Sequence, residues 1–133
     1  MTTPPWWDDL PRESIGVGAA LIDELLGLVL AGRKTACCGA LHLFTAPVPR
    51  AGDRCVLVDA SGRPRCVIED EEVVVQRFSD VGEAFALLEG EGDYAEWRAA
   101  HEAYFTKLGG FSPDMQVVCE RFCVLEVIEP DSA

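Results

Sequence analysis

The sequence has few basic residues and no long uninterrupted hydrophobic run. Only 11 of its 133 residues are Lys or Arg, against 23 Asp and Glu, so the net charge at pH 7 is −12. Proteins that bind a nucleic-acid backbone over a wide surface depend on Lys and Arg to release counterions. The composition therefore excludes extended backbone binding. We expect no DNA partner, and any RNA contact must be local.

Segments typical of membrane insertion and secretion are also missing. The longest apolar segment, residues 19–31, is interrupted by Asp23 and Glu24, and the start of the chain is acidic rather than basic. We expect neither a membrane-spanning helix nor a signal peptide. The six cysteines show neither Cys-x-x-Cys spacing nor the framework of a secreted protein. We predict reduced thiols in a cytoplasmic protein with no membrane contact, no metal site and no cofactor.

The residues that are present indicate one globular domain spanning residues 1–133. Hydrophobic residues make up 49% of the chain and charged residues 26%, which is enough apolar material for a packed core. Residues 1–13 are rich in proline and predict an extended N-terminal arm, because proline removes backbone donors. Trp6 and Trp7 in this arm fit two roles, anchoring the arm or stacking on a base.

Helical periodicity and capping signals predict three helices. Apolar residues repeat at helical spacing over residues 18–31, and Gly32 provides a left-handed stop. Asp80, with Glu83 three residues later, has capping-box spacing and predicts a short helix to residue 88. Asp93 and Glu96 predict a second capping box, opening a helix over residues 94–108.

The remaining apolar segments predict strands. Residues 33–44 have strand-like content, residues 54–59 and 64–69 form a predicted hairpin through residues 60–63, and residues 72–78 and 117–128 are further β segments. Because these strands do not alternate regularly with the helices, the fold class is α+β, with a curled, mostly antiparallel sheet or β-barrel and about three flanking helices.

Several short motifs follow one another in a distinctive order. They are Ala31-Gly32-Arg33-Lys34-Thr35-Ala36, Gly52-Asp53, Asp59 with Gly62-Arg63-Pro64, Glu89-Gly90-Glu91-Gly92-Asp93, Trp97-Arg98 with His101, and Val118-Cys119-Glu120-Arg121-Phe122. In this order they resemble the ASCH domain over about residues 15–126, most closely the bacterial subgroup with the Glu-Gly-Glu-Gly-Asp stretch. The resemblance implies a β-barrel similar to the PUA domain, whose relatives bind RNA. It also implies a cleft where the lysine motif meets the acidic motif.

The resemblance also implies candidate catalytic residues. The wider family includes an amidohydrolase that acts on acetylated cytidine through a lysine, a threonine and a glutamate, and a member described as a ribonuclease. Lys34 matches the lysine and Glu91 best matches the glutamate. Cys37 stands where the hydrolase has its threonine, so its thiol could preserve hydrolysis as a nucleophile or mark its loss. The loop after Cys38 is shorter than in typical members of the subgroup.

Lys34 and the two glutamates each fit a second interpretation. Lys34 follows a helix, where a cation complements the helix dipole, but it could also act as a base with a lowered pKa or stabilise an oxyanion. Glu91 precedes a helix, where an acid is favoured for the same electrostatic reason. Alternatively, Glu89 and Glu91 could both lie beside Lys34 and accept hydrogen bonds from the exocyclic amine of a base.

The other candidate ligand-binding residues also fit structural roles. Trp97 and His101 lie on one helix stripe and are typical of packing residues, although they could also contact a ligand. Arg121 could pair with an acidic residue of the 89–91 loop or contact phosphate. Arg33 and Thr35 flank Lys34 and complete the candidate set.

Three functional hypotheses follow. The first is hydrolysis of an amide in a modified nucleoside or similar small ligand, through Lys34, Cys37 and Glu91. The second is an RNA-binding module without chemistry, which reads a single-stranded base in the same cleft. The third is an endoribonuclease, with Lys34 and His101 as acid and base if their side chains converge.

Overall fold

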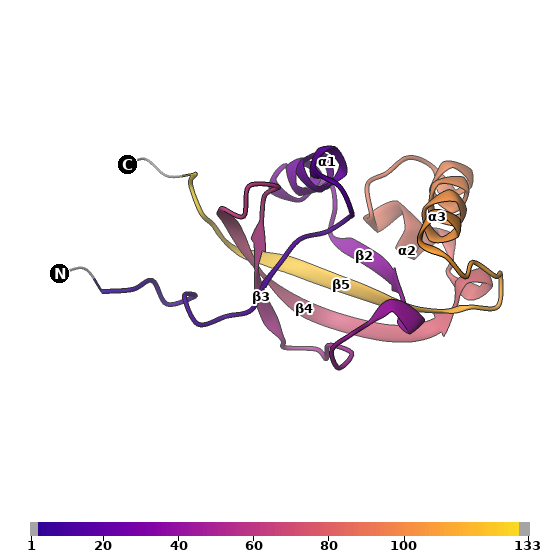
Figure 1. The fold of residues 1–133 in the computed structure, drawn as a ribbon, viewed down its shortest axis with the longest axis horizontal. Helices are drawn as coiled ribbons and strands as arrows, with labels where there is room; N and C mark the ends of the chain where they lie inside the picture. Colours follow the sequence, from indigo (N-terminus) through magenta and orange to yellow (C-terminus); the bar gives the residue numbers. More distant parts are fainter. Residues whose placement is uncertain (1–2, 131–133) are drawn as a thin grey trace.

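A computed structural model describes residues 3–130 of the chain. The elements, with η denoting a 3-10 helix, are β1 (Arg12–Glu13), α1 (Ala19–Leu30), β2 (Ala36–Ala40), η1 (Leu41–Leu43), β3 (Arg54–Val58), β4 (Pro64–Arg77), η2 (Phe78–Asp80), α2 (Glu83–Leu88), α3 (Tyr94–Leu108) and β5 (Gln116–Val127). The α+β class is confirmed. Figure 1 shows the curled sheet with α1 at one end and α2 and α3 at the other.

The five strands form one sheet in the order β1-β3-β4-β5-β2. All neighbours are antiparallel except β1 and β3, which pair in parallel. Within the described part of the chain, β1 and β2 are therefore edges that do not pair with each other. The sheet is curled but open, so of the two predicted forms the curled sheet is confirmed and the β-barrel is not. No helix among residues 3–130 is both long and apolar enough to cross a membrane.

Two of the predicted helices begin and end where the sequence indicates. Helix α1 ends at Leu30, and its C-cap Ala31 precedes Gly32, whose φ of 76° lies in the left-handed region that glycine favours. At the start of α3, the Asp93 carboxylate accepts from the Glu96 amide while the Glu96 carboxylate accepts from the Asp93 amide. This reciprocal capping box confirms the predicted N-terminus.

The other predicted cap is wrong. Gly82, rather than Asp80, precedes α2, and no side chain caps that helix. Asp80 ends η2 and pairs instead with Arg77 at 3.0 Å. The Asp-x-x-Glu spacing does not form a capping box here, because the 3-10 helix η2 ends at Asp80 and α2 begins only at Glu83.

Three strand predictions also need correction. The strand predicted over residues 33–44 is limited to β2, since η1 follows it. The segments predicted at 64–69 and 72–78 form one strand, β4, with a register shift between Asp70 and Glu72. In the predicted arm, Arg12 and Glu13 pair with β3 because Val56 N donates to Pro11 O at 2.8 Å. Residues 1–2 of that arm lie outside the described residues.

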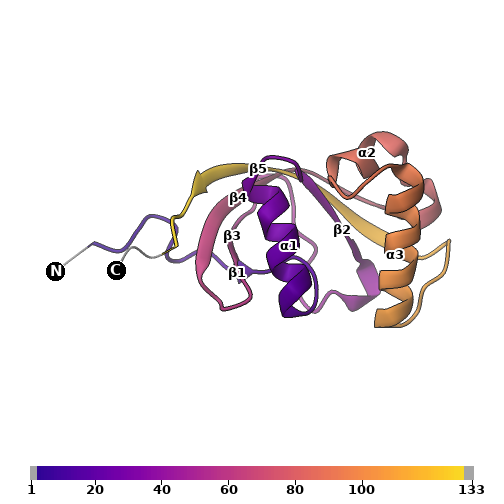
Figure 2. The same ribbon diagram turned by 90° about the horizontal axis from the view of Figure 1, so that it is seen from above.

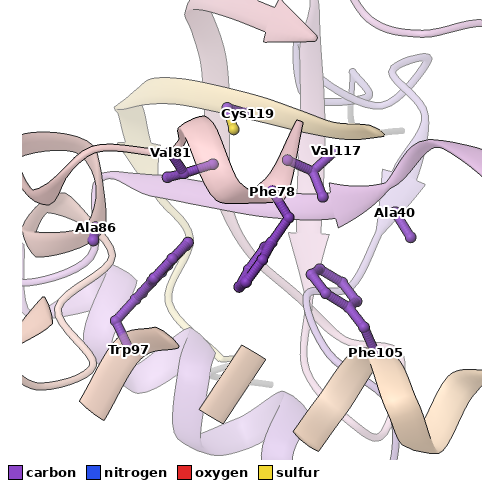
Figure 3. Packing of buried hydrophobic residues seen from close by; sticks show 8 residues of the cluster. All are labelled: Ala40, Phe78, Val81, Ala86, Trp97, Phe105, Val117 and Cys119. Carbon is purple, nitrogen blue, oxygen red and sulfur yellow. The ribbon is translucent and has the colours of Figure 1, made fainter. Parts of the chain in front are cut away.

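Two hydrophobic clusters pack against opposite faces of β5. In the first, Phe78 stacks on Trp97 of α3 with ring centroids 5.5 Å apart (Figure 3). In the second, Phe122 packs with residues of α1, β3 and β4. Val117 and Cys119 belong to the first cluster and Phe122 to the second, as the two-residue period of a strand requires. As a result, β2 runs between α1 and α3 (Figure 2), and the candidate site lies along this edge strand.

Candidate functional site

The site begins where two loops distant in the sequence touch. The Thr35 amide, just before β2, donates to Leu88 O at the end of α2 at a distance of 2.8 Å. Gly90 has a φ of 70°, and a Cβ at this position would lie only 2.3 Å from Arg33 O. Glycine is therefore required for the contact between the loops. This contact brings the segment after α1 against the Glu89–Glu91 segment.

Lys34 lies between two carboxylates at this junction. Its Nζ donates to Glu89 Oε1 at 2.9 Å and to Glu91 Oε2 at 2.8 Å, and a longer contact of 3.5 Å reaches the Glu89 carbonyl. Lys34 and Glu89 are each only 1% exposed, whereas the Glu91 side chain is 21% exposed. The structure thus brings the predicted lysine and both predicted glutamates together.

Helix α3 provides two more partners for Glu89. Trp97 Nε1 donates to Glu89 Oε2 at 2.8 Å, and His101 Nε2 lies 3.4 Å from Glu89 Oε1. His101 Nδ1 lies 2.9 Å from the Trp97 carbonyl, so a proton on Nδ1 can be donated there. Both oxygens of Glu89 are therefore contacted by groups that favour its ionised form.

The balance of burial and charge favours the charged forms of Lys34, Glu89 and His101. Burial lowers the pKa of Lys34, but Glu89 and Glu91 outweigh this effect and raise it above its ordinary value. Burial likewise opposes ionisation of Glu89, yet His101 and Lys34 hold its pKa below the ordinary value. Burial lowers the pKa of His101, and Glu89 reverses this so that the pKa is raised. Of the two chemical roles predicted for Lys34, the base with a lowered pKa is contradicted, because the pKa is raised.

Cys37 reaches the same site from β2. Its Sγ lies 3.7 Å from Glu120 Oε2, to which the thiol donates. Burial, followed by the nearby Glu120 charge, raises the pKa of Cys37 well above its ordinary value, with Lys34 opposing only in part. The thiol is therefore protonated at neutral pH and acts as a donor rather than as a ready nucleophile.

These groups line a cavity of about 180 Å³ between α1, β2 and α3. Lys34, Cys37, Glu89, Glu91 and His101 contribute its polar wall. Apolar side chains complete it: Ile15, Leu21, Leu25, Ala100 and Tyr104. A second cavity, of about 840 Å³, shares Ile15, Gly16, Cys37, Cys38 and Tyr104 with the first. Together the two cavities form the cleft, whose mixture of apolar walls and few polar groups is typical of a small-ligand site.

One set of side chains in this cleft has the donor types of a metal site. Single donor atoms of Glu89, Glu91 and His101 lie within 4.8 Å of one another. However, Lys34 Nζ already contacts both carboxylates at 2.8–2.9 Å. A metal ion would have to displace a charged ammonium group, so the donor set is better explained as a binding site for the lysine itself.

Four of the candidate ligand-binding residues lie outside the cavity lining. Trp97 is completely buried behind Glu89, and Arg33 is exposed. Thr35 Oγ1 contacts Leu88 O at 3.4 Å. Arg121 pairs with Glu71 at 2.7 Å rather than with the 89–91 loop, so the predicted pairing of Arg121 is wrong. Roles for these four residues in ligand binding stay predictions.

Four acidic residues of the cleft were not among the candidates predicted from the sequence, and two of them, Asp70 and Glu120, lie on adjacent strands. Glu120 follows Val117, Val118 and Cys119, which are all buried, and its strand position places it on the same face as Phe122. A charged residue at an inward position of an apolar strand is the signal that could have identified it. Asp70 gave no comparable signal, because residues 69–72 are all acidic.

Comparison with known proteins supports the family resemblance. The family model described as "ASCH domain" matches residues 13–126. No match was found among curated proteins.

Solved structures show similar folds. A protein of Enterococcus faecalis superposes with a TM-score of 0.80 at 28% identity, covering 88% of this chain and 77% of that chain. An ASCH domain of Lactobacillus crispatus superposes with a TM-score of 0.77 at 30% identity, covering 86% of this chain and 78% of that chain. A mutant ASCH protein of Zymomonas mobilis superposes with a TM-score of 0.57 at 14% identity, covering 81% of this chain and 68% of that chain. This match shows similarity of fold alone.

Proposed function

Because the chain belongs to the ASCH domain family, we propose that its cleft binds a modified nucleobase or nucleoside and hydrolyses an amide on it. The single observation that carries this proposal is that Lys34, Cys37 and Glu91, from separate segments, line one cavity. The larger neighbouring cavity, of about 840 Å³, lies in the size range of a small-ligand site. We also propose a cytoplasmic location and membership of the bacterial subgroup with the Glu-Gly-Glu-Gly-Asp stretch.

The walls suit a polar aromatic ring. Leu25 and Tyr104 give apolar surface against which a base can pack, and carboxylates such as Glu91 can accept hydrogen bonds from its exocyclic amine. A local site of this kind is compatible with a net charge of −12, because it needs no extended contact with phosphates.

In the proposed reaction, water is the nucleophile. Glu91 contacts Lys34 through Oε2, which leaves Oε1 to take a proton as the water oxygen attacks the amide carbon. The carbonyl oxygen becomes an oxyanion, which the Lys34 ammonium stabilises, joined by the Cys37 S–H when it turns away from Glu120. The C–N bond then breaks, and the departing amine takes the proton from Glu91. The products are a carboxylic acid and the free amine of the base.

The ionisation of the site supports these roles. Lys34 is charged and its third N–H has only the 3.5 Å contact with the Glu89 carbonyl, so it can turn to an oxyanion. Glu91 is the most exposed member of the ion-paired group and can exchange protons with a bound water. Glu89, Trp97 and His101 hold Lys34 in place and are positioning residues.

The test is incubation of the purified protein with N4-acetylcytidine and a panel of other acylated nucleosides, with chromatography of the released nucleoside. Glu91→Gln is expected to lower the rate at least about 100-fold, since it removes the general base. Glu72→Gln, which removes an exposed carboxylate outside the cleft, is the matched control and should leave the rate unchanged. No turnover of any compound, or full turnover by Glu91→Gln, would refute the proposal.

Substitution of Cys37 separates the two roles of the thiol. If Cys37 donates a hydrogen bond, Cys37→Ser should retain the rate within about tenfold, because a hydroxyl also donates. If the thiol were the nucleophile, both Cys37→Ala and Cys37→Ser would lose turnover, and an acyl-enzyme would be detectable by mass spectrometry.

The protonated Cys37 thiol also favours a second candidate, an RNA-binding module without chemistry. In this case single-stranded RNA should bind at low salt, where electrostatic attraction is greatest, and remain intact. The same samples, examined for cleaved RNA, test the endoribonuclease hypothesis. That third hypothesis is less favoured, because His101 is only 7% exposed and both its ring nitrogens have partners.

A further inference from the structure

The larger cavity contains an acidic pair that the proposed hydrolysis does not use. Asp70 on β4 and Glu120 on β5 both line it, together with Cys37, which also lines the smaller cavity. Glu13 and Asp53 add two more carboxylates to its wall. This part of the cleft therefore differs from the part around Lys34, where the acids already surround a cation of the chain.

Asp70 is the unusual member of the pair. It is only 7% exposed, yet its Oδ1 has no hydrogen-bond partner. Leaving a buried carboxylate oxygen without a donor is costly, so such an atom in a cavity wall indicates a place where a donor binds. Among residues 3–130, no Lys or Arg forms an ion pair with Asp70 or Glu120 within 4.0 Å.

Glu120 completes the pair from the neighbouring strand. It lies opposite Cys37 in the antiparallel register and accepts the thiol contact at 3.7 Å. Asp70 pairs with Phe122, two residues beyond Glu120, so both acids project from the same face of the sheet. Among the described residues that line this cavity, Arg54 is the only basic one; it pairs with Glu69 at 2.8 Å and lies over the Trp6 ring at 5.8 Å.

We propose that Asp70 and Glu120 form a subsite for an organic ammonium group, so that the ligand of the cleft carries a positive charge beside its base. The protein itself contains an example of an ammonium group bound by two carboxylates, because Lys34 Nζ lies 2.8–2.9 Å from Glu89 and Glu91. Apart from a protonated Glu120 carboxyl, which hydrogen-bonds to Asp70, the described chain offers Asp70 Oδ1 no donor, and an ammonium group on a ligand would provide one. This inference rests on the proposed function in one respect: it adds a positive charge to the small ligand proposed for the cleft.

An organic cation suits the pair better than a metal ion. Within the described part of the chain, the only cluster with three donors close enough for a metal is Glu89, Glu91 and His101, which line the smaller cavity. Hard divalent ions require more oxygen ligands than two. A primary ammonium needs only two or three acceptors and is satisfied by a carboxylate pair.

The electrostatics of the pair make binding dependent on pH. Burial, followed by Asp70, raises the pKa of Glu120 to about 8, and burial raises the pKa of Asp70. At neutral pH the two acids therefore hold a shared proton, which an ammonium ion would displace. Affinity should rise with pH while Glu120 ionises. The other charged or titratable groups facing this cavity are Glu13 of β1, Cys37 and Cys38 of β2, Asp53, Arg54 and Cys55 at β3, and Tyr104 of α3.

The test uses n-butylammonium as probe and n-butanol, which has the same chain without the charge, as its control. Binding to the full chain is followed by NMR shifts and calorimetry. We expect saturable binding of n-butylammonium at least about tenfold tighter than that of n-butanol, since charge-assisted hydrogen bonds are the stronger class. Affinity should increase from about pH 6 to about pH 9, with proton release, and this dependence should disappear in Glu120→Gln.

Asp70→Asn and Glu120→Gln should each weaken n-butylammonium binding about tenfold or more, because each removes one charge of the pair. Glu72→Gln on the same strand β4 lies outside the cavity and should bind as the unmodified protein does. Equal binding of the amine and the alcohol, no saturable binding of the amine, or equal loss in Glu72→Gln would overturn the inference. The comparison of amine with alcohol needs no variant, so poor folding of Asp70→Asn would not obscure the result.

The outcome also separates this inference from the proposed hydrolysis. Binding of n-butylammonium without turnover of acylated nucleosides would support the subsite and refute the reaction. Turnover of N4-acetylcytidine without ammonium binding would support the reaction and refute the subsite. If both hold, cytidine carrying an N4-3-aminopropanoyl group should be hydrolysed faster than its N4-butanoyl equivalent, which has the same chain length without charge.

Discussion

Replacing Lys34 by Met would test how far the buried ion pair holds the site together. Met keeps an unbranched chain but removes the ammonium, which leaves Glu89, only 1% exposed, with donors from Trp97 and His101 alone. Glu91 is 21% exposed and can recover hydrogen bonds from water. The main penalty is therefore the uncompensated charge of Glu89.

We expect Lys34→Met to lower the free energy of unfolding by about 3–5 kcal/mol at neutral pH, the usual cost of removing one partner of a buried pair. Adding Glu89→Gln removes the stranded charge, so the double variant should lose about 2 kcal/mol less than Lys34→Met alone. The effect depends on pH. In the unmodified protein, the lowered pKa of Glu89 contributes stability above its unfolded pKa, and this is lost as pH falls. The penalty of Lys34→Met should therefore shrink in acid, where Glu89 becomes neutral.

The assay is urea unfolding of the unmodified protein, both single variants and the double variant, followed by tryptophan fluorescence. Trp97 is completely buried and contacts Glu89, so its emission reports directly on the site. A loss below about 1 kcal/mol in Lys34→Met, or additive losses in the double variant, would refute the view that Glu89 is a buried charge dependent on Lys34.

Three further predictions follow from individual contacts. Glu120 has a pKa of about 8 against an ordinary 4.5, so between these pH values the folded state binds a proton that the unfolded state lacks. The free energy of unfolding should therefore fall by about 2–4 kcal/mol as pH rises from the ordinary pKa to the raised one. In urea titrations across this range, Glu120→Gln should remove most of that slope, and an unchanged slope would contradict the assignment. Gly90→Ala should cost at least about 2 kcal/mol more than Gly62→Ala, since both have positive φ but only the Gly90 side chain would meet backbone; equal melting temperatures would argue against the loop contact. Trp97→Phe should lower the free energy of unfolding by about 1–3 kcal/mol, because Glu89 Oε2 loses its indole donor, and a neutral effect in urea unfolding would show that this bond is dispensable.

Local signals in the sequence predicted much of the fold. The capping box of Asp93 and Glu96 and the stop at Gly32 act within a few residues, and the structure has both. The same type of signal failed at Asp80, because local spacing does not reveal that η2 comes first. The joining of two predicted strands into β4 depends on pairing with β5 along its whole length, which no local pattern encodes.

The candidate site was predictable only in part. Lys34 and Glu91 were identified because their motifs resemble those of a known family, and they lie 2.8 Å apart. Their ionisation was not predictable, because it depends on burial and on the number of acids around one ammonium group. Asp70 and Glu120 were not recognised as a pair, because the long-range register between β4 and β5 places them on one face of the sheet.

The adjacent residues Cys37 and Cys38 pack against different hydrophobic clusters, Cys37 with the cluster beneath α1 and Cys38 with the cluster beneath α3. Both residues also line the cleft. A compound bound in the cleft would contact residues packed against both hydrophobic clusters, and would stabilise the two clusters together across the edge strand β2. Ligand binding should therefore slow amide hydrogen exchange in α1 and α3 to a similar degree, although the two helices are far apart in the sequence.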